Sequence, residues 1–424
     1  MQLKKKYKPV RNTLAVATAS LLGSVAHSPT VQAEGDWEID SSLMYYAETD
    51  RVSLFEPIIR ARKDMGNDSF LNIRLVVDTL TGSSANGAIA TGSAQTFTTP
   101  SGNSTYSTPA NTTPLDDTFH DTRVAVSGEW EKPINRDWTA IYGLNFSTEY
   151  DYQSVGLSAT LNRDFNQKNS TLSIGVAYNA DTVEPVGGAP VGLTAMPTFP
   201  ATKATQGSSL NKDVYDILVG WTQVLGRKDI MQFNFNYGNE SGYLSDPYKI
   251  LSVVDGTTGD LVASDPYLYE KRPDDRTRQA FFTRWSHQFD SDVLRVAYRY
   301  FWDDWGITSH TIDTHYRWEL GGSHYVEPHL RYYTQTAADF YNTSLVDGSI
   351  PEFASADYRL GDLTTTTVGM KYGFELGKNS EIGIRAEMIN QQADPSAVIG
   401  NQSSQDLVPD VEALLIQFNY SLIF

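Results

Sequence analysis

The sequence contains no cysteine among its 424 residues. This absence excludes structural disulfides, thiolate metal sites and cysteine nucleophiles. Basic residues are in the minority, with 33 Lys and Arg against 51 Asp and Glu, so the net charge is −18. A protein that neutralises nucleic-acid phosphates needs clustered Lys and Arg, and we therefore expect no nucleic-acid partner.

Long apolar runs are a further absence. Beyond residue 33, no apolar stretch approaches the roughly 20 residues that a membrane-spanning helix requires, and the mean hydropathy is −0.36. Aromatic residues nevertheless make up 12% of the chain, with 24 tyrosines and 8 tryptophans. A transmembrane β-barrel reconciles these features, because only every second residue of its strands faces lipid while the others face a polar lumen.

Residues 1–33 predict a Sec-type signal peptide. A short apolar run over residues 14–26 is followed by a small-residue cleavage site at Val31-Gln32-Ala33. The basic residues that precede the run are Lys4, Lys5, Lys6, Lys8 and Arg11. A retained amphipathic anchor helix is the alternative. Cleavage would leave residues 34–424 as the mature barrel.

Strict alternation of apolar and polar residues predicts strands. It is clearest at the end of the chain, where Leu414, Ile416, Phe418, Tyr420, Leu422 and Phe424 form one face, opposite Gln417, Asn419 and Ser421. A helix would scatter these residues around its circumference. About sixteen such segments (14–18 possible) predict an all-β, antiparallel, up-and-down transmembrane barrel. They lie near residues 36–48, 51–63, 69–80, 121–132, 136–150, 152–166, 170–183, 212–226, 229–242, 273–289, 292–305, 307–320, 324–339, 361–376, 379–392 and 410–424.

The connections between these segments alternate in length. Every second one is tight and polar, and the other series contains all the long ones, near residues 81–120, 184–211, 243–272, 340–360 and 393–409. Short periplasmic turns and long extracellular loops are typical of barrels in the Gram-negative outer membrane with both termini in the periplasm. The expected partners are the lipid bilayer, lipopolysaccharide and the barrel-assembly machinery, whose C-terminal recognition signal the strand ending at Phe424 resembles.

Charged residues between the apolar positions are expected to face the lumen, because an Arg or Lys at mid-bilayer costs about 2–4 kcal/mol on the lipid face. The lumen-lining candidates are Arg60, Arg62, Arg74, Arg123, Arg284, Arg295, Arg299, Asp313, His315, Arg317, Glu327, His329, Arg331 and Arg385.

A predicted hairpin at Gly321-Gly322-Ser323 allows a register to be assigned. A three-residue loop places Arg317 opposite Glu327, His315 opposite His329, and Asp313 opposite Arg331, as two ion pairs and a histidine pair on one inward face. We interpret these residues as a polar ladder that holds the wall, and we expect no metal. A metal site and a pH switch are the alternatives for the histidine pair.

No catalytic motif is present, and we expect neither a catalytic residue nor a cofactor. The nearest comparable cluster is His120 with Asp116, Asp117 and Asp121, for which solvated surface is the favoured interpretation. Loop 81–120 is polar and almost uncharged before Asp116. We expect it to be a solvated surface loop, and a loop folded inward to constrict the lumen is the alternative.

Two stretches resemble a family of Gram-negative outer-membrane proteins that is known only as a domain of unknown function. Residues 40–62 are one, and Asp78-Thr79-Leu80-Thr81-Gly82-Ser83-Ser84-Ala85-Asn86-Gly87-Ala88, of the pattern D-x-L-T-G-x-S-x-N-G-A, is the more specific. The resemblance implies a barrel and a periplasmic redox partner, and it provides no catalytic residue. It also marks 78–88 as important, so we assign Asp78, Gly82, Asn86 and Gly87 as candidates for anchoring a constriction loop.

A pore or channel for small polar solutes is the leading functional hypothesis, because barrels of this size most often serve transport. The second hypothesis is a non-transport barrel, a scaffold or conduit for a periplasmic or surface partner. An outer-membrane hydrolase is the third.

Overall fold

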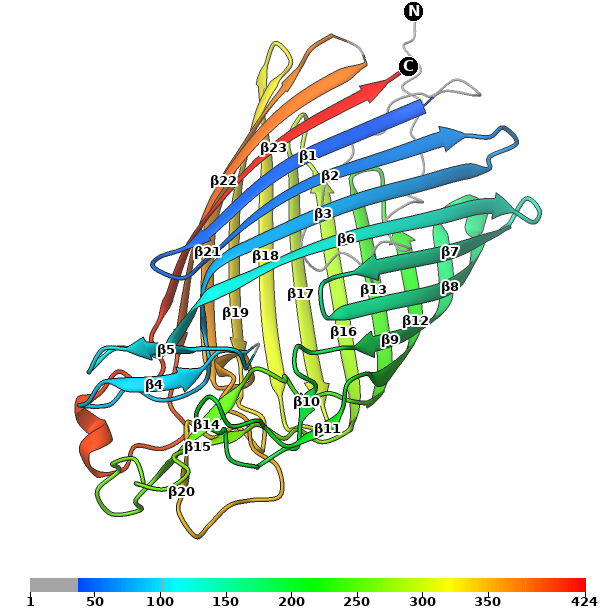
Figure 1. Ribbon diagram of the computed structural model, residues 1–424. Coiled ribbons are helices and arrows are strands. Elements are labelled where there is room, and N and C mark those ends of the chain that lie inside the picture. Colours follow the sequence, from blue (N-terminus) through cyan, green and yellow to red (C-terminus); the bar gives the residue numbers. More distant parts are fainter. Residues whose placement is uncertain (1–36, 101, 378) are drawn as a thin grey trace, which may run out of the picture.

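The computed structural model describes residues 37–100, 102–377 and 379–424, so the predicted signal peptide at 1–33 lies outside the described residues. Sixteen strands close into one antiparallel barrel (Figure 1). In pairing order they are β1 (Trp37–Glu48), β2 (Val52–Asp64), β3 (Phe70–Ala85), β6 (Leu115–Pro133), β7 (Trp138–Thr148), β8 (Tyr152–Phe165), β9 (Ser170–Val183), β12 (Leu210–Val224), β13 (Asp229–Gly242), β16 (Asp275–Gln288), β17 (Val293–Asp303), β18 (Thr308–Gly321), β19 (His324–Gln335), β21 (Leu363–Glu375), β22 (Ser380–Ala393) and β23 (Val411–Ile423). The predicted fold class and strand order are confirmed.

The barrel closes where the first and last strands pair. Glu38 lies opposite Ile423 in an antiparallel ladder. Beyond it, the Phe424 N–H donates to the Trp37 carbonyl at 3.0 Å, and the Trp37 N–H donates to the Phe424 carbonyl at 2.8 Å. The backbone groups at this seam are therefore paired, and the sheet has no open edge there.

Large apolar side chains are exposed on one face of the wall. Ile312 and Trp318 of β18 are 49% and 53% exposed, and Leu330 of β19 is 53% exposed. Charged and polar residues take the alternate positions. None of the helices in the described part of the chain is long and apolar enough to cross a membrane.

The five long connections leave the barrel at one end, the lower end in Figure 1, opposite the end where β1 begins and β23 stops. They span residues 86–114, 184–209, 243–274, 336–362 and 394–410, and we call them together the loop cap. The cap has short elements of its own: β4 (Gln95–Thr98), β5 (Thr105–Thr108), β10 (Ala189–Pro190), β11 (Thr205–Gly207), β14 (Ile250–Val254), β15 (Tyr267–Tyr269), β20 (Ser344–Val346), η2 (Tyr358–Leu360) and η3 (Gly400–Ser404).

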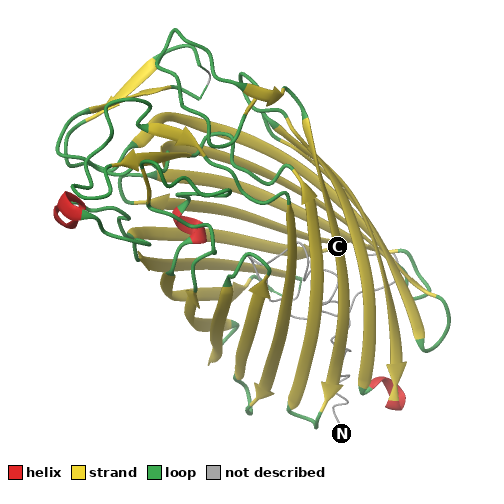
Figure 2. Cartoon of the chain, turned by 90° about the horizontal axis from the view of Figure 1, so that it is seen from below, coloured by secondary structure: helices red, strands yellow, loops and turns green. Residues whose placement is uncertain are grey.

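The connections of the loop cap pack against one another (Figures 1 and 2). Strands β15, β14 and β20 form a three-stranded sheet that joins two connections, and β14 pairs with β20 in parallel, with Ser252 opposite Ser344. The Leu193 N–H donates to the Tyr269 carbonyl at 2.9 Å, and this bond ties the 184–209 connection to the three-stranded sheet. The cap is a small folded layer.

The expectation of a solvated loop over 81–120 is wrong for its central part. Ile89 is 2% exposed and Phe97 is 1% exposed. Phe97 packs with Ile250 and Tyr267 of another connection. These partners lie more than 150 residues away in sequence, so no local pattern within the loop indicates its burial.

Candidate functional site: the inner wall and its histidine pair

The fourteen predicted lumen-lining residues lie on a single face of the wall. Strand pairing links their positions around the barrel, from Arg60 opposite Arg74 on β2 and β3 to Asp313 opposite Arg331 on β18 and β19. Alternation places all of them on the face opposite to the exposed apolar side chains.

This face is the concave one. Arg295 of β17 contacts Glu327 of β19, and His329 of β19 contacts Glu387 of β22, so each contact passes over an intervening strand. Side chains from strands that are two apart converge on the inside of a curved sheet and diverge on its outside. The charged face therefore surrounds the barrel interior.

Many charges on the inner face pair along the wall. The ion pairs among the described strand residues lie within one strand, as for Arg317–Glu319 and Arg385–Glu387, or between strands that are neighbours or next neighbours in barrel order. Examples are Arg60–Asp40 at 3.7 Å, Arg62–Glu38 at 3.6 Å, Lys212–Glu240 at 3.7 Å, Arg278–Asp216 at 3.3 Å and Lys371–Glu381 at 3.4 Å. These groups satisfy one another without reaching across the interior.

The register of the β18–β19 hairpin follows the prediction. Asp313 lies opposite Arg331, and His315 lies opposite His329. The turn consists of Gly322 and Ser323, both with positive φ, so the prediction of a three-residue loop is wrong. A bulge between Glu319 and Gly321 supplies the extra residue that keeps the predicted register. A glycine such as Gly322 adopts a positive φ without the steric cost that other residues incur there.

The two ion pairs predicted from that register are wrong. Asp313 contacts both histidines, and Arg317 bonds Glu319 of its own strand. Glu327 contacts Arg295 and His315 in place of Arg317. The curvature of the wall explains the Arg295–Glu327 contact, because it brings side chains from next-neighbour strands within reach. The other differences arise because residues two apart on one strand share a face, as Asp313 and His315 do, whereas the prediction considered only directly opposite residues.

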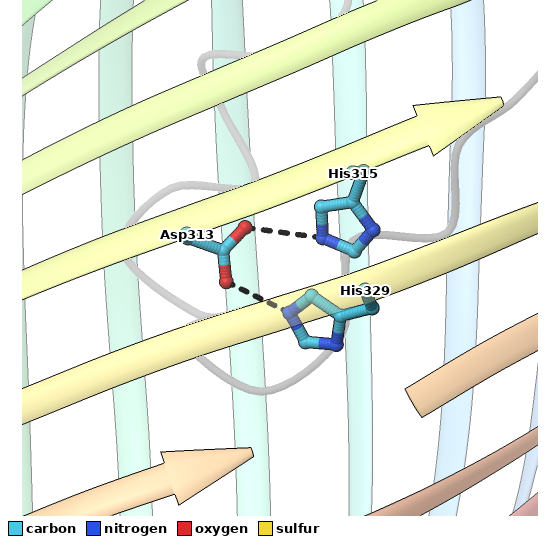
Figure 3. A group of neighbouring side chains, drawn as sticks. All are labelled: Asp313, His315 and His329. Carbon is cyan, nitrogen blue, oxygen red and sulfur yellow. Dashed lines mark hydrogen bonds and ion pairs between the residues drawn. The ribbon is translucent and has the colours of Figure 1, made fainter. Parts of the chain in front are cut away.

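The two histidines form the most compact group on this face (Figure 3). Their rings stack with centroids 4.1 Å apart and planes 6° from parallel. Both direct Nε2 towards one carboxylate, because His315 Nε2 lies 3.0 Å from Asp313 Oδ1 and His329 Nε2 lies 3.1 Å from Asp313 Oδ2. His315 is 8% exposed, so the group is largely shielded by its neighbours.

The other ring nitrogens face two further carboxylates. His329 Nδ1 is 2.9 Å from Glu387 Oε1, within hydrogen-bonding geometry. His315 Nδ1 is 3.3 Å from Glu327 Oε1, at ion-pair distance but outside hydrogen-bonding geometry. Arg295 contacts Glu327, and Arg385 lies 3.7 Å from Glu387. The result is a chain of alternating charge across five strands, β17 to β22.

The donor atoms of Asp313, His315 and His329 all lie within 4.8 Å of one another, so these three residues are able to hold a metal ion. Sequence reasoning identified the three residues but not the role of Glu387. That residue lies on β22, two strands away from His329 and three from His315 in barrel order, and no spacing within a hairpin indicates it.

The segment 78–88 anchors the loop cap to the barrel. The ideal Cβ position of Gly82 lies 2.3 Å from the Arg51 carbonyl oxygen, and that of Gly87 lies 2.4 Å from the Ile250 carbonyl oxygen. Both glycines have positive φ. The Asn86 side chain accepts from the Ala88 N–H at 2.8 Å. The two glycines thus let this segment press against the β1–β2 turn and the 243–274 connection.

Asp78, the first residue of this segment, lies on the inner face of the barrel and pairs with Arg123. Strand β3 continues to Ala85 and β6 begins at Leu115, so both are longer than predicted. A register shift between Gly82 and Ser84 allows the extra pairing. Whether the segment constricts the lumen stays a prediction.

The loop cap contains a buried ionic network that the sequence did not indicate. Arg272 Nε lies 2.6 Å from Glu270 Oε1, and its Nη2 lies 3.0 Å from Asp357 Oδ2. The side chains of Glu270 and Asp357 are 0% and 1% exposed. Burial raises the pKa of Glu270, with Arg272 opposing the shift. Burial also opposes ionisation of Asp357, but Arg359 outweighs it and holds the pKa of Asp357 well below its usual range.

The residues of the His120 cluster differ in their burial. His120 is exposed and Asp116 is buried at the start of β6. Asp121 lies instead with Glu149 and Asp151, where one oxygen of each carboxylate comes within 4.8 Å of the others. The side chain of Asp117 lies outside the described residues.

Known structures share the barrel fold. The siderophore receptor PirA from Acinetobacter baumannii is 8% identical, with a TM-score of 0.42 over 91% of this chain and 58% of that chain. A Pseudomonas aeruginosa PfeA mutant with enterobactin is 10% identical, with a TM-score of 0.43 over 91% and 60%. OccK2 (OpdF) from the same organism is 8% identical, with a TM-score of 0.41 over 93% and 100%. The chain thus spans less than two thirds of the two receptors' length. The likeness is one of fold alone.

No curated protein matches the sequence. The model of the family described as "Protein of unknown function (DUF3570)" matches residues 11–422, nearly the whole chain. This protein therefore belongs to the DUF3570 family, as the resemblance to a barrel family of unknown function implied.

Proposed function

We propose that this protein is a passive pore for small polar solutes in the Gram-negative outer membrane. The observation that carries the proposal is the inner face, where charged groups pair along the wall between neighbouring and next-neighbour strands. Barrels of about 16 strands enclose an aqueous channel. Inward charges that are neutralised locally fit a hydrated interior, whereas a packed interior would require partners from the opposite wall.

The loop cap is proposed to set the size limit of the pore. All five long connections gather at one end of the barrel, and their packing and buried ionic network hold them in one arrangement (Figure 2). A folded layer at a pore mouth restricts passage more than mobile loops of the same length.

Conductance of the purified full chain in planar bilayers tests the proposal. We expect discrete, ohmic single-channel steps that grow with salt concentration. Silent bilayers, with a closed barrel verified by heat-dependent migration in gels, would contradict the pore and favour the scaffold hypothesis, which co-purification of a partner would then test.

A deletion within the loop cap tests the size limit. The Asn111 N–H donates to the Thr91 carbonyl at 2.7 Å, so the ends of the 92–110 segment already lie together. Replacing 92–110 by two glycines should leave the barrel closed and raise the single-channel conductance. Gly92→Ala is the control within the same segment, because a Cβ there meets no atom within 4 Å and Gly92 is not among the glycines with positive φ. Equal conductance of the deletion variant and the native chain would refute a limiting role for this connection.

A further inference from the structure

Two imidazoles and one carboxylate share a common point on the inner wall. Nε2 of His315 and Nε2 of His329 approach separate oxygens of Asp313, at 3.0 and 3.1 Å. The three residues come from β18 and β19, paired directly in the same hairpin. Their donor atoms thus converge from a rigid part of the fold, which suits a precisely positioned binding site.

The surroundings match those of metal-bound histidines. A histidine that binds a metal through one ring nitrogen usually donates its other N–H to a carboxylate, which fixes the tautomer and the ring orientation. His329 Nδ1 faces Glu387 in this way at 2.9 Å, and His315 Nδ1 lies 3.3 Å from Glu327. If both Nδ1 atoms carry the proton, both Nε2 lone pairs are free and point towards Asp313.

The spacing also fits a small ion. Zinc binds His nitrogens at about 2.0–2.1 Å and carboxylate oxygens at about 2.0–2.2 Å, so neighbouring ligand atoms in a tetrahedral site lie roughly 3.3 Å apart. The nitrogen-to-oxygen distances of 3.0 and 3.1 Å differ from that spacing by a few tenths of an ångström. To bind one ion together, the stacked rings, whose planes are 6° from parallel, would have to tilt until both planes contain the ion. Solvent would complete its coordination.

The charge around the site is partly balanced already. The carboxylates of Glu327 and Glu387 already have Arg295 and Arg385 beside them, whereas Asp313 is shared by the two histidines.

We propose that Asp313, His315 and His329 bind one divalent first-row transition-metal ion, with Zn²⁺ as the probe, on the inner wall of the barrel. Imidazole nitrogens suit Zn²⁺, Cu²⁺, Ni²⁺ and Fe²⁺, whereas Ca²⁺ and Mg²⁺ prefer all-oxygen sites. The site is the alternative to the polar ladder at these positions. It stands independently of the pore proposal, because binding is measured on the isolated chain.

Equilibrium dialysis of the purified, untagged full chain tests this site. The chain is stripped with a chelator and dialysed against Zn²⁺, and bound metal is measured by mass spectrometry. We expect one Zn²⁺ per chain that excess Ca²⁺ does not displace, and loss of that ion in the double variant His315→Gln/His329→Gln. Glu387→Gln should weaken binding about 10- to 100-fold while leaving the three ligands in place.

The control is His310→Gln. This residue lies on the same strand, on the face opposite the cluster, and bonds the Tyr298 hydroxyl. It should bind Zn²⁺ as the native chain does. Asp313→Asn, which preserves shape, should reduce binding even if the double variant folds poorly. The proposal is overturned if the native chain binds no Zn²⁺, or if Asp313→Asn binds it unchanged.

Discussion

Replacing Arg272 by methionine removes the cation at the centre of the loop cap. Its guanidinium contacts Glu270 at 2.6 Å and Asp357 at 3.0 Å, and both carboxylates are shielded from solvent. Methionine fills a similar volume but leaves Glu270 charged, buried and without this partner. Breaking a buried pair in this way costs about 3–5 kcal/mol. Asp357 retains Arg359 at 2.6 Å, so the loss concentrates on Glu270.

That cost should appear as local opening of the cap rather than unfolding of the barrel, because the sixteen strands are closed without the cap residues. A loss of about 3–5 kcal/mol corresponds to amide exchange that is roughly 10²- to 4 × 10³-fold faster, at 1.4 kcal/mol for each tenfold change. Peptides that cover β14 and β15 should show the change, while peptides from β18 and β19 should not.

Hydrogen–deuterium exchange with mass spectrometry measures this effect. Arg227→Met is the matched control, because it makes the same chemical change at an exposed position in the turn between β12 and β13. Adding Glu270→Gln to Arg272→Met should recover part of the protection, since the buried charge is then gone. Equal exchange of the Arg272→Met and Arg227→Met chains over β14 and β15 would refute the reasoning.

Two further predictions concern the same cap. Gly87→Ala places a Cβ 2.4 Å from the Ile250 carbonyl oxygen at a φ of +97°. It should therefore destabilise the cap by about 1–3 kcal/mol and raise the single-channel conductance. Gly102→Ala is the control, because it also has positive φ but no nearby atom, and it should leave the conductance unchanged. If both variants conduct alike, the docking of Gly87 does not control the pore. The second prediction concerns acid. Because the pKa of Asp357 is held low in the folded cap, its ionisation stabilises the cap above its unfolded pKa of about 4, and this contribution is lost as the pH falls further. The pKa of Glu270 is raised, so its protonation has the opposite effect on stability. As the pH falls through milder acidity, this protonation stabilises the cap. Amide protection of β14 should therefore decline below about pH 4 in the native chain, and Asp357→Asn should abolish that decline; a decline of the same size in the variant would show that Asp357 is not its cause.

The barrel was predictable because its strands carry a local signal. In β23, Leu414, Ile416, Phe418, Tyr420 and Leu422 are each two positions apart, and this period assigns both the strand and its faces. The register of the β18–β19 hairpin was also predictable, because inward residues of paired strands must share one face. The loop length was not, since a two-residue turn with a bulge between Glu319 and Gly321 sets His315 opposite His329.

The side-chain partners were less predictable, because they depend on curvature and on distant loops. Glu387 reaches His329 across β21, and Arg295 reaches Glu327 across β18. No spacing in the sequence encodes such contacts. The buried position of Phe97 likewise depends on Tyr267, 170 residues further along the chain. Loop residues of this kind have no periodicity that marks them as buried.

Single-channel recording of the native full chain in planar bilayers is the decisive test of the pore. We expect stable, ohmic conductance steps, because charges that pair along the inner wall fit a hydrated interior. A correctly folded barrel that produces no conductance at any salt concentration would contradict it.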